Sequence, residues 1–198
     1  MTPFPFLTVF IILLVAYSIR RTTLTRRREQ REEAFWARER EAEHAPPRDL
    51  STLEYIRVPV ERFSFGAVDD DELSMLEEEL LALAKKPLLN LDGRTNTDVR
   101  LDYGAANFDA VSQMGEDYDR LIVVLCDYAK GLMEAGREDL ASGVLEYGVE
   151  IGTDISANYT LLADCYRHAG EEAKLMELRS RVEASQLPLK DSILRQLD

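Results

Sequence analysis

No proline occurs between Leu88 and Leu187, so nothing of that kind breaks a helix anywhere in this long stretch. Apolar residues recur in it at helical spacing and predict four helices, over 117–135, 138–151, 156–168 and 171–185. Glycine stands at the ends of three of them, where it can adopt the left-handed conformation that closes a helix, at Gly136, Gly152 and Gly170. The sequence therefore predicts an all-α domain.

Two segments of this stretch align with a shift of 34 residues. In the alignment Ala129 matches Ala163, and Gly136 matches Gly170. Small alanines allow helices to approach closely, and the glycines permit the turn that follows each helix. The sequence thus predicts two helical hairpins of the same design.

A period of 34 residues in paired helices is typical of tetratricopeptide repeats, so residues 117–185 resemble two such repeats, with a helix over 189–197 as a polar cap. The small, large and small positions of the family's second helix are filled by Ala141, Leu145 and Gly148. The match is partial, because the family's tryptophan is absent and three positions differ, at Thr153, Leu175 and Arg179. Two repeats are fewer than the usual three, so the segment before residue 117 is expected to cover the part of the hairpins that a third repeat would otherwise cover.

The resemblance implies an α-solenoid in which the first helix of each hairpin lines a groove for a protein segment. Carried onto this sequence, the groove face comprises Val123, Cys126, Lys130, Met133, Thr160, Asp164, Arg167 and His168. The members of the family that clamp a terminal carboxylate need Lys and Asn in a set order, which this chain lacks, so that clamp is not expected. In the alternative interpretation the segment 87–116 fills the groove and these residues only pack.

The N-terminus carries a second constraint. Residues 4–19 contain no charge and are almost wholly apolar, and five arginines follow within nine residues, at Arg20, Arg21 and Arg26 to Arg28. About 17–25 apolar residues suffice for a helix to cross a bilayer. A secretory signal would place its positive charge before the apolar run, so we expect an uncleaved transmembrane anchor over 1–20. Positive flanks stay in the cytoplasm, which predicts an outside N-terminus and a cytoplasmic C-terminal domain.

Charge divides the chain sharply. Residues 1–48 hold nine Arg and six Glu, whereas residues 49–198 hold 15 basic and 31 acidic side chains. Nucleic acid should be repelled by the acidic part, so the expected partners are the bilayer and a basic or amphipathic segment of another protein. Cys126 and Cys165 both fall in apolar helical contexts. In a reducing compartment we expect them to be core residues, not a disulfide or a metal pair.

Between the anchor and the hairpin region over 117–198, the sequence predicts two segments. A charged helix over 26–43 and a linker with Pro46 and Pro47 form a juxtamembrane region over 21–48. Residues 49–116 hold an extended arm near 55–65, a helix over 70–86 and a long polar loop over 87–116. Asp69 to Asp71 are expected to cap the helix over 70–86, and Asp154 or Ser156 to cap the helix over 156–168.

The polar loop supplies the other candidate site. Long connections are often functional, and residues 90–107 hold polar side chains that could form the site of a small-ligand sensor or an enzyme: Asn96, Asp98, Tyr103 and Asn107. Asp98 and Asp102 could also lie one helical turn apart and perform acid–base chemistry, although nothing else in the sequence supports that. The alternation of Asn and Asp is similar to a calcium loop, but glycine does not fall at the sixth position and no Glu closes the twelve. Calcium is therefore not predicted.

The sequence carries no recognisable catalytic motif. The chain has no Gly-rich phosphate loop and no Cys-x-x-Cys, and its only histidines are His44 and His168. These are too few for most metal sites or catalytic triads. We therefore predict no catalytic residue, cofactor or metal, and interpret the chain as a non-enzyme.

The whole chain is similar to the small, membrane-anchored, tetratricopeptide-like proteins of Gram-positive bacteria. The similarity rests on the anchor, on Asn96-Thr97-Asp98 with Tyr103-Gly104, and on the stretch from Gly148 to Thr153. It implies an architecture and no assigned activity. The leading hypothesis is a single-pass membrane adaptor or scaffold whose cytoplasmic domain binds a protein. The alternatives are a ligand sensor or enzyme that uses the polar loop, and an outward-facing envelope assembly factor.

Overall fold

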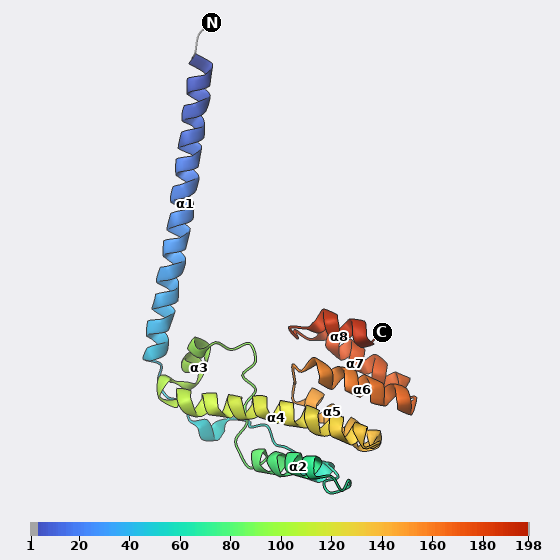
Figure 1. The fold of residues 1–198 in the computed structure, drawn as a ribbon. Coiled ribbons are helices and arrows are strands. Elements are labelled where there is room, and N and C mark those ends of the chain that lie inside the picture. Colours follow the sequence, from blue (N-terminus) through green and yellow to red (C-terminus); the bar gives the residue numbers. More distant parts are fainter. Residues whose placement is uncertain (1–3, 198) are drawn as a thin grey trace. The chain divides into compact units, whose positions relative to one another are not determined.

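The computed structural model describes residues 4–197, and of residues 4–8 and Ile19 it describes the backbone alone. Helices make up 74% of the chain and the described residues form no strand, so the expected all-α class is confirmed. The helices (Figure 1) are α1 (Phe4–Glu43), α2 (Asp71–Leu83), α3 (Asn96–Tyr103), α4 (Phe108–Glu134), α5 (Glu138–Glu150), α6 (Ser156–Ala169), α7 (Glu172–Ala184) and α8 (Lys190–Leu197). Three short 3-10 turns complete the order, η1 (Leu50–Thr52), η2 (Val60–Arg62) and η3 (Ala105–Asn107).

The chain divides into two compact units, and each unit combines two parts of the sequence. Unit 1 comprises Met1–Leu50 and Arg94–Phe108, and unit 2 comprises Ser51–Gly93 and Asp109–Asp198. The segment 49–116, expected from sequence as one region, is therefore shared between the two units.

In unit 1, the last turns of α1 are fastened to α3. The Thr95 hydroxyl accepts a hydrogen bond from the Asp98 amide at 3.2 Å, and the Asp98 carboxylate accepts one from the Thr95 amide at 2.9 Å. This reciprocal pair is a capping box, which satisfies two backbone donors at the start of α3. Asp98 also pairs with Arg38 of α1, and Thr97 donates to Glu39 of α1. The start of α3 is thus tied to α1 by charged and polar contacts.

A close backbone approach follows in unit 1, where the proline linker meets the turn after α3. The Arg48 amide donates to the Tyr103 carbonyl at 3.0 Å. Gly104 has φ of +94°, and a Cβ at this position would lie 2.4 Å from Pro47 Cα. Both the backbone conformation and the lack of space require glycine at this turn.

Unit 2 repeats one pattern of helix, turn and helix. α5 and α7 each contain 13 residues, and α7 begins and ends 34 positions after α5. Each is preceded by a glycine with φ near +70°, Gly136 or Gly170. One residue later, an amide donates back to the preceding helix at 2.8 Å, from Arg137 to the Leu132 carbonyl and from Glu171 to the Tyr166 carbonyl. The 34-residue period of the sequence is therefore also a period of the backbone hydrogen bonds that end α4 and α6.

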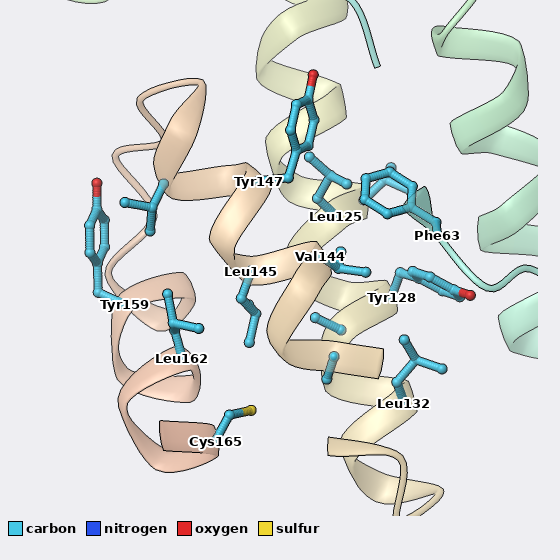
Figure 2. Close-up of a cluster of buried hydrophobic side chains, with 14 of the residues drawn as sticks. Phe63, Leu125, Tyr128, Leu132, Val144, Leu145, Tyr147, Tyr159, Leu162 and Cys165 are labelled. Carbon is cyan, nitrogen blue, oxygen red and sulfur yellow. The ribbon is translucent and has the colours of Figure 1, made fainter. Parts of the chain in front are cut away.

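The core of unit 2 contains side chains from α4, α5 and α6, with Phe63 from the segment after η2 (Figure 2). Ala129, Ala141 and Ala163 are fully buried, one on each of the three helices. At Gly148 of α5, a Cβ would lie 2.5 Å from Oδ1 of Asn158 on α6. The Asn158 side-chain amide donates to the Leu145 carbonyl of α5 at 2.9 Å. Small residues and this buried hydrogen bond set how closely α5 and α6 pack.

Five buried tyrosines connect the helices of unit 2 to neighbouring segments. Their hydroxyls donate from Tyr118 to the Ile151 carbonyl (3.2 Å), Tyr128 to Glu77 (2.8 Å), Tyr147 to the Arg57 carbonyl (3.0 Å), Tyr159 to the Thr153 carbonyl (2.7 Å) and Tyr166 to Glu146 (2.9 Å). Burial is the main cause that raises the pKa of each of these hydroxyls, so all five remain donors at neutral pH.

Most helices predicted from hydrophobic spacing are confirmed. The ranges 70–86, 138–151, 156–168, 171–185 and 189–197 correspond to α2, α5, α6, α7 and α8, and 26–43 is the second part of α1. The predicted cap of α2 is also confirmed, because the Asp70 carboxylate accepts from the Leu73 amide at 2.9 Å. The predicted cap of α6 is wrong: its N-cap is Ile155, without a side-chain bond. Asp154 lies one residue too early for that role, and Ser156 is already inside the helix.

The polar loop predicted over 87–116 is largely helical, so that prediction is wrong. It contains α3, η3 and the beginning of α4, which starts at Phe108 instead of residue 117. The short α3 buries only Val99, which leaves almost no apolar periodicity to detect. The beginning of α4 contains Gly115, which lies against Leu91, since a Cβ there would be 2.7 Å from Leu91 Cδ1. This glycine serves helix packing and does not end the helix.

The arm expected near 55–65 contains no strand. It follows an irregular path between η1 and η2, with one backbone hydrogen bond of 3.0 Å from the Ile56 amide to the Leu88 carbonyl. Val58 and Phe63 are buried in the core of unit 2. The arm therefore acts as a cover for the helices and not as part of a sheet.

The anchor predicted over 1–20 begins on residues 1–3, which lie outside the described residues. From Phe4 onward the backbone of α1 is continuous to Glu43 (Figure 1). The side chains from Val9 to Val15 are exposed on this helix. Over the part of the chain that the structure describes, no helix meets the length and apolarity needed to cross a membrane.

Candidate functional site

α2 packs against α4 within unit 2, and the local sequence explains how. A Cβ at Gly131 of α4 would lie 2.7 Å from Leu73 Cδ2 of α2, so this glycine allows the two helices to approach closely. Further along, the Arg120 guanidinium donates to both carboxylate oxygens of Glu79, at 2.6 and 2.7 Å. Such a bidentate pair is geometrically specific. It is the main cause that lowers the pKa of Glu79.

A groove of about 470 Å³ lies between the beginning of α2 and the end of α4. Apolar or small side chains line one part of it, namely Leu73, Leu76, Gly131 and Ala135. Charged side chains line the rest, namely Asp70, Glu72, Asp127, Lys130 and Glu134. We call this feature the α2–α4 groove.

The α2–α4 groove carries net negative charge. Its one lysine, Lys130, has its ammonium 3.7 Å from Glu134 of the same helix. Glu72 and Asp127 are exposed and form no ion pair with any described residue. The last turn of α4 contains no basic residue, so its side chains leave the partial negative charge of the final carbonyls uncompensated. The groove is thus suited to a positively charged group.

A second depression of about 440 Å³ is lined by residues after α2, after α5 and after α7. Asp92 and Asp154 line it, and beside it the Asn90 amide donates to the Tyr118 hydroxyl at 2.9 Å. Burial, followed by the charges of Asp154 and Asp119, raises the pKa of Asp92. In the described part of the chain no group of His, Cys, Asp or Glu is arranged to hold a metal ion. This depression concentrates negative charge without forming a coordination site.

Both cysteines are free thiols in the interior of unit 2, as predicted. Burial raises the pKa of the Cys126 and Cys165 thiols to about 11. Both are therefore protonated at neutral pH and are poor nucleophiles. Cys165 Sγ lies 3.9 Å from Met133 Sδ, which places α4 and α6 in contact at this point.

The groove residues predicted on α4 differ in their exposure. Val123 and Lys130 are exposed, Met133 is half-buried against Cys165, and Cys126 is buried. Lys130 lines the α2–α4 groove. The predicted stripe is therefore not one continuous open surface.

The groove residues predicted on α6 already have partners within unit 2. The Thr160 hydroxyl donates to the Ala157 carbonyl at 3.1 Å, and Asp164 pairs with Arg167 at 2.9 Å. Arg167 also donates to the Gln196 carbonyl of α8 at 3.2 Å. His168 Nδ1 lies 2.9 Å from the Glu138 carboxylate of α5. α8 thus covers part of the surface expected to be open.

The polar-loop residues are brought together in unit 1. Asp98 belongs to the capping box of α3 and pairs with Arg38. The Asn107 side-chain amide donates to the Arg48 carbonyl at 2.7 Å and to the Tyr103 carbonyl at 2.8 Å. Asn96 is the first residue of α3 and is exposed. Most of these polar groups therefore hold the linker and α3 in place.

Sequence reasoning did not find the α2–α4 groove. Its two walls lie far apart in the chain, and nothing in the local pattern of either helix says that they meet. Two signals were present in α4: Gly131 inside its last turn, and Asp127 and Glu134 seven residues apart on one face. Both signals indicate a groove only when it is known that α2 lies alongside α4.

Comparisons of the chain with models of protein families, with curated proteins and with solved structures find no match.

Proposed function

We propose that this protein is a membrane-attached adaptor whose unit 2 binds another protein. The observation that carries the proposal is the helical hairpin that recurs after 34 residues, with the same glycine turn and the same backbone hydrogen bonds. Stacked hairpins of this period resemble tetratricopeptide repeats, whose extended surfaces serve protein binding. In unit 2 both cysteine thiols are buried, and the surface offers open, charged grooves.

Membrane attachment is the second part of the proposal. It is supported by the apolar run over 4–19 in the sequence, by the exposed side chains from Val9 to Val15, and by the arginines that follow. With those arginines in the cytoplasm, the part of unit 1 that follows the apolar run and the whole of unit 2 lie on the cytoplasmic side. An adaptor held at a membrane raises the effective concentration of its partner there.

Affinity purification tests the binding function. The full chain, with a C-terminal tag, is extracted from membranes in mild detergent and compared with an unrelated tagged membrane protein. We expect at least one protein to be enriched with this chain alone. If circular dichroism shows a folded chain and both baits recover the same proteins, the adaptor function is refuted.

Protease treatment of intact protoplasts tests the topology. A tag at the C-terminus should survive until the cells are lysed, because the proposal places it inside. Digestion of the tag in intact protoplasts would contradict the cytoplasmic location and favour the outward-facing envelope factor.

A further inference from the structure

We propose that the α2–α4 groove is the docking site for a lysine- or arginine-bearing segment of a partner protein. The inference rests on the proposed adaptor function and identifies both the surface used and the chemistry of its ligand. It differs from the groove expected from the repeat pattern, since α2 and not α6 forms the second wall.

The distribution of charge along α2 and α4 supports a cationic ligand. Towards the end of α2, two carboxylates have partners within the fold: Glu79 binds Arg120, and Glu77 accepts from the Tyr128 hydroxyl, whereas Glu78 is exposed. At the groove, Glu72 and Asp127 form no ion pair with any described residue. Two carboxylates thus lie unpaired beside the apolar lining of the groove, and the end of α4, whose last turn has no basic side chain, adds partial negative charge.

The shape of the groove favours a side chain over a metal ion. A metal ion requires several ligands that converge on one point, and no set of described residues does so. The groove instead combines small or apolar positions at Gly131 and Ala135 with carboxylates around them. A lysine or arginine can lay its aliphatic stem along such a surface while its charged head reaches the carboxylates.

Peptide binding to the full chain in nanodiscs of zwitterionic lipid tests the proposal. The probe is a fluorescein-labelled heptapeptide of alternating lysine and leucine, and its binding is followed by fluorescence anisotropy. The matched peptide has glutamate in place of every lysine, and empty nanodiscs give the background. We expect binding of the lysine peptide only, and weaker binding as salt is added.

Two double variants locate the binding. Glu72→Gln with Asp127→Asn removes two exposed groove carboxylates, and we expect about tenfold weaker binding of the lysine peptide. Glu78→Gln with Glu116→Gln removes the same charge from exposed positions of the same helices outside the groove. The control variant should bind within about twofold of the unchanged chain, since its groove is intact. All four positions are exposed, so both variants should keep the same thermal stability.

Three results would overturn the proposal. The first is an equal loss of affinity in both variants, which would indicate general charge attraction. The second is binding of the glutamate peptide as well as the lysine peptide. The third is no binding of either peptide. A second copy of this chain would be the ligand if two results occur together. A peptide of residues 20–31 would compete with the lysine peptide for the groove, and sedimentation would show a dimer for the unchanged chain but not for the groove variant.

The affinity purification keeps this inference separate from the proposed function. If the groove variant still recovers every partner of the unchanged chain, the adaptor function stands and the groove inference fails. If neither chain recovers a specific protein while the lysine peptide binds in the groove, the adaptor function fails and the groove chemistry stands.

Discussion

At the scale of single residues, several glycines are constrained because a neighbouring segment leaves no space for a Cβ. Gly104 meets Pro47 in unit 1, and Gly131 meets Leu73 in unit 2. By contrast, Gly93 has space around it and only its positive φ favours glycine. The sequence shows all three glycines, but it does not show which of them is packed against a neighbour.

Replacement of Gly104 by alanine tests this distinction. Gly104→Ala adds a Cβ that would lie 2.4 Å from Pro47 Cα and also strains the positive φ. We expect unit 1 to lose roughly 1–3 kcal/mol of local stability, measured by hydrogen exchange of the Arg48 amide. Gly93→Ala, with φ of +72° and nothing within 4 Å, is the control and should leave that amide protected.

The capping box of α3 makes unit 1 sensitive to acid. The hydrogen bonds from the Thr95 side chain and backbone lower the pKa of Asp98, and Arg38 lowers it further. Because the carboxylate form is favoured in the folded state, its contribution to stability is complete above the ordinary aspartate pKa of about 3.9 and is lost as pH falls through the lowered value. The protection factors of the α3 amides in hydrogen exchange, which correct for the intrinsic pH dependence of the exchange rate, should therefore fall below about pH 4.

Asp98→Asn provides the comparison for this pH effect. The variant loses the ion pair with Arg38, so its α3 amides should have lower protection factors at neutral pH, with little further loss of protection on acidification. If the variant and the original protein lose protection of α3 equally on acidification, a group other than Asp98 controls the effect.

At the scale of elements, the two hairpins of unit 2 show how a short sequence signal becomes a packed structure. α5 and α7 begin after the same glycine turn, so their start could be predicted from sequence. Their packing is not the same, because Gly148 of α5 meets Asn158, whereas Val182 of α7 is a buried apolar side chain. Local signals set the helix ends, and the contacts depend on what lies across from each helix.

Substitutions at two glycines of α5 allow the effect of packing on stability to be measured separately from the effect of helix propensity. Gly148→Ala would place a Cβ 2.5 Å from the Asn158 Oδ1, and Asn158 is buried and hydrogen-bonded, so we expect a loss of roughly 1–3 kcal/mol in the free energy of unfolding. Gly143→Ala meets nothing within 4 Å and should instead gain about 0.5–1 kcal/mol. Urea denaturation of the two variants measures both values. A gain for Gly148→Ala would show that α5 and α6 can separate at low cost.

At the scale of the whole molecule, charge is divided between the two units. Unit 1 holds 11 basic and nine acidic side chains, whereas unit 2 holds 13 basic and 28 acidic ones. The arginines of α1 follow an apolar run, and the carboxylates of unit 2 surround its grooves. The proposed function assigns attachment to the first and recognition to the second.

Membrane extraction tests attachment. We expect the full chain to stay with membranes in alkaline carbonate and to dissolve in detergent, because the exposed run from Val9 to Val15 needs an apolar environment. Ile12→Arg with Val15→Arg should release it, since each arginine costs about 2.5–3.5 kcal/mol at the centre of a membrane helix. Leu24→Arg, outside the run, is the matched control. Release of the unchanged chain by carbonate would contradict a membrane anchor.

The sequence by itself determined the helical class, most helix ends, the cap of α2 and the burial of both cysteines. These features depend on apolar spacing and on glycine or aspartate within a few residues, so short stretches of sequence are enough to predict them. Only the tertiary structure decided that residues 94–108 join the end of α1, that α8 covers part of α6, and that α2 forms a groove with α4. Each of these joins segments far apart in the chain, and such pairing depends on the fit of whole surfaces, which no local pattern contains.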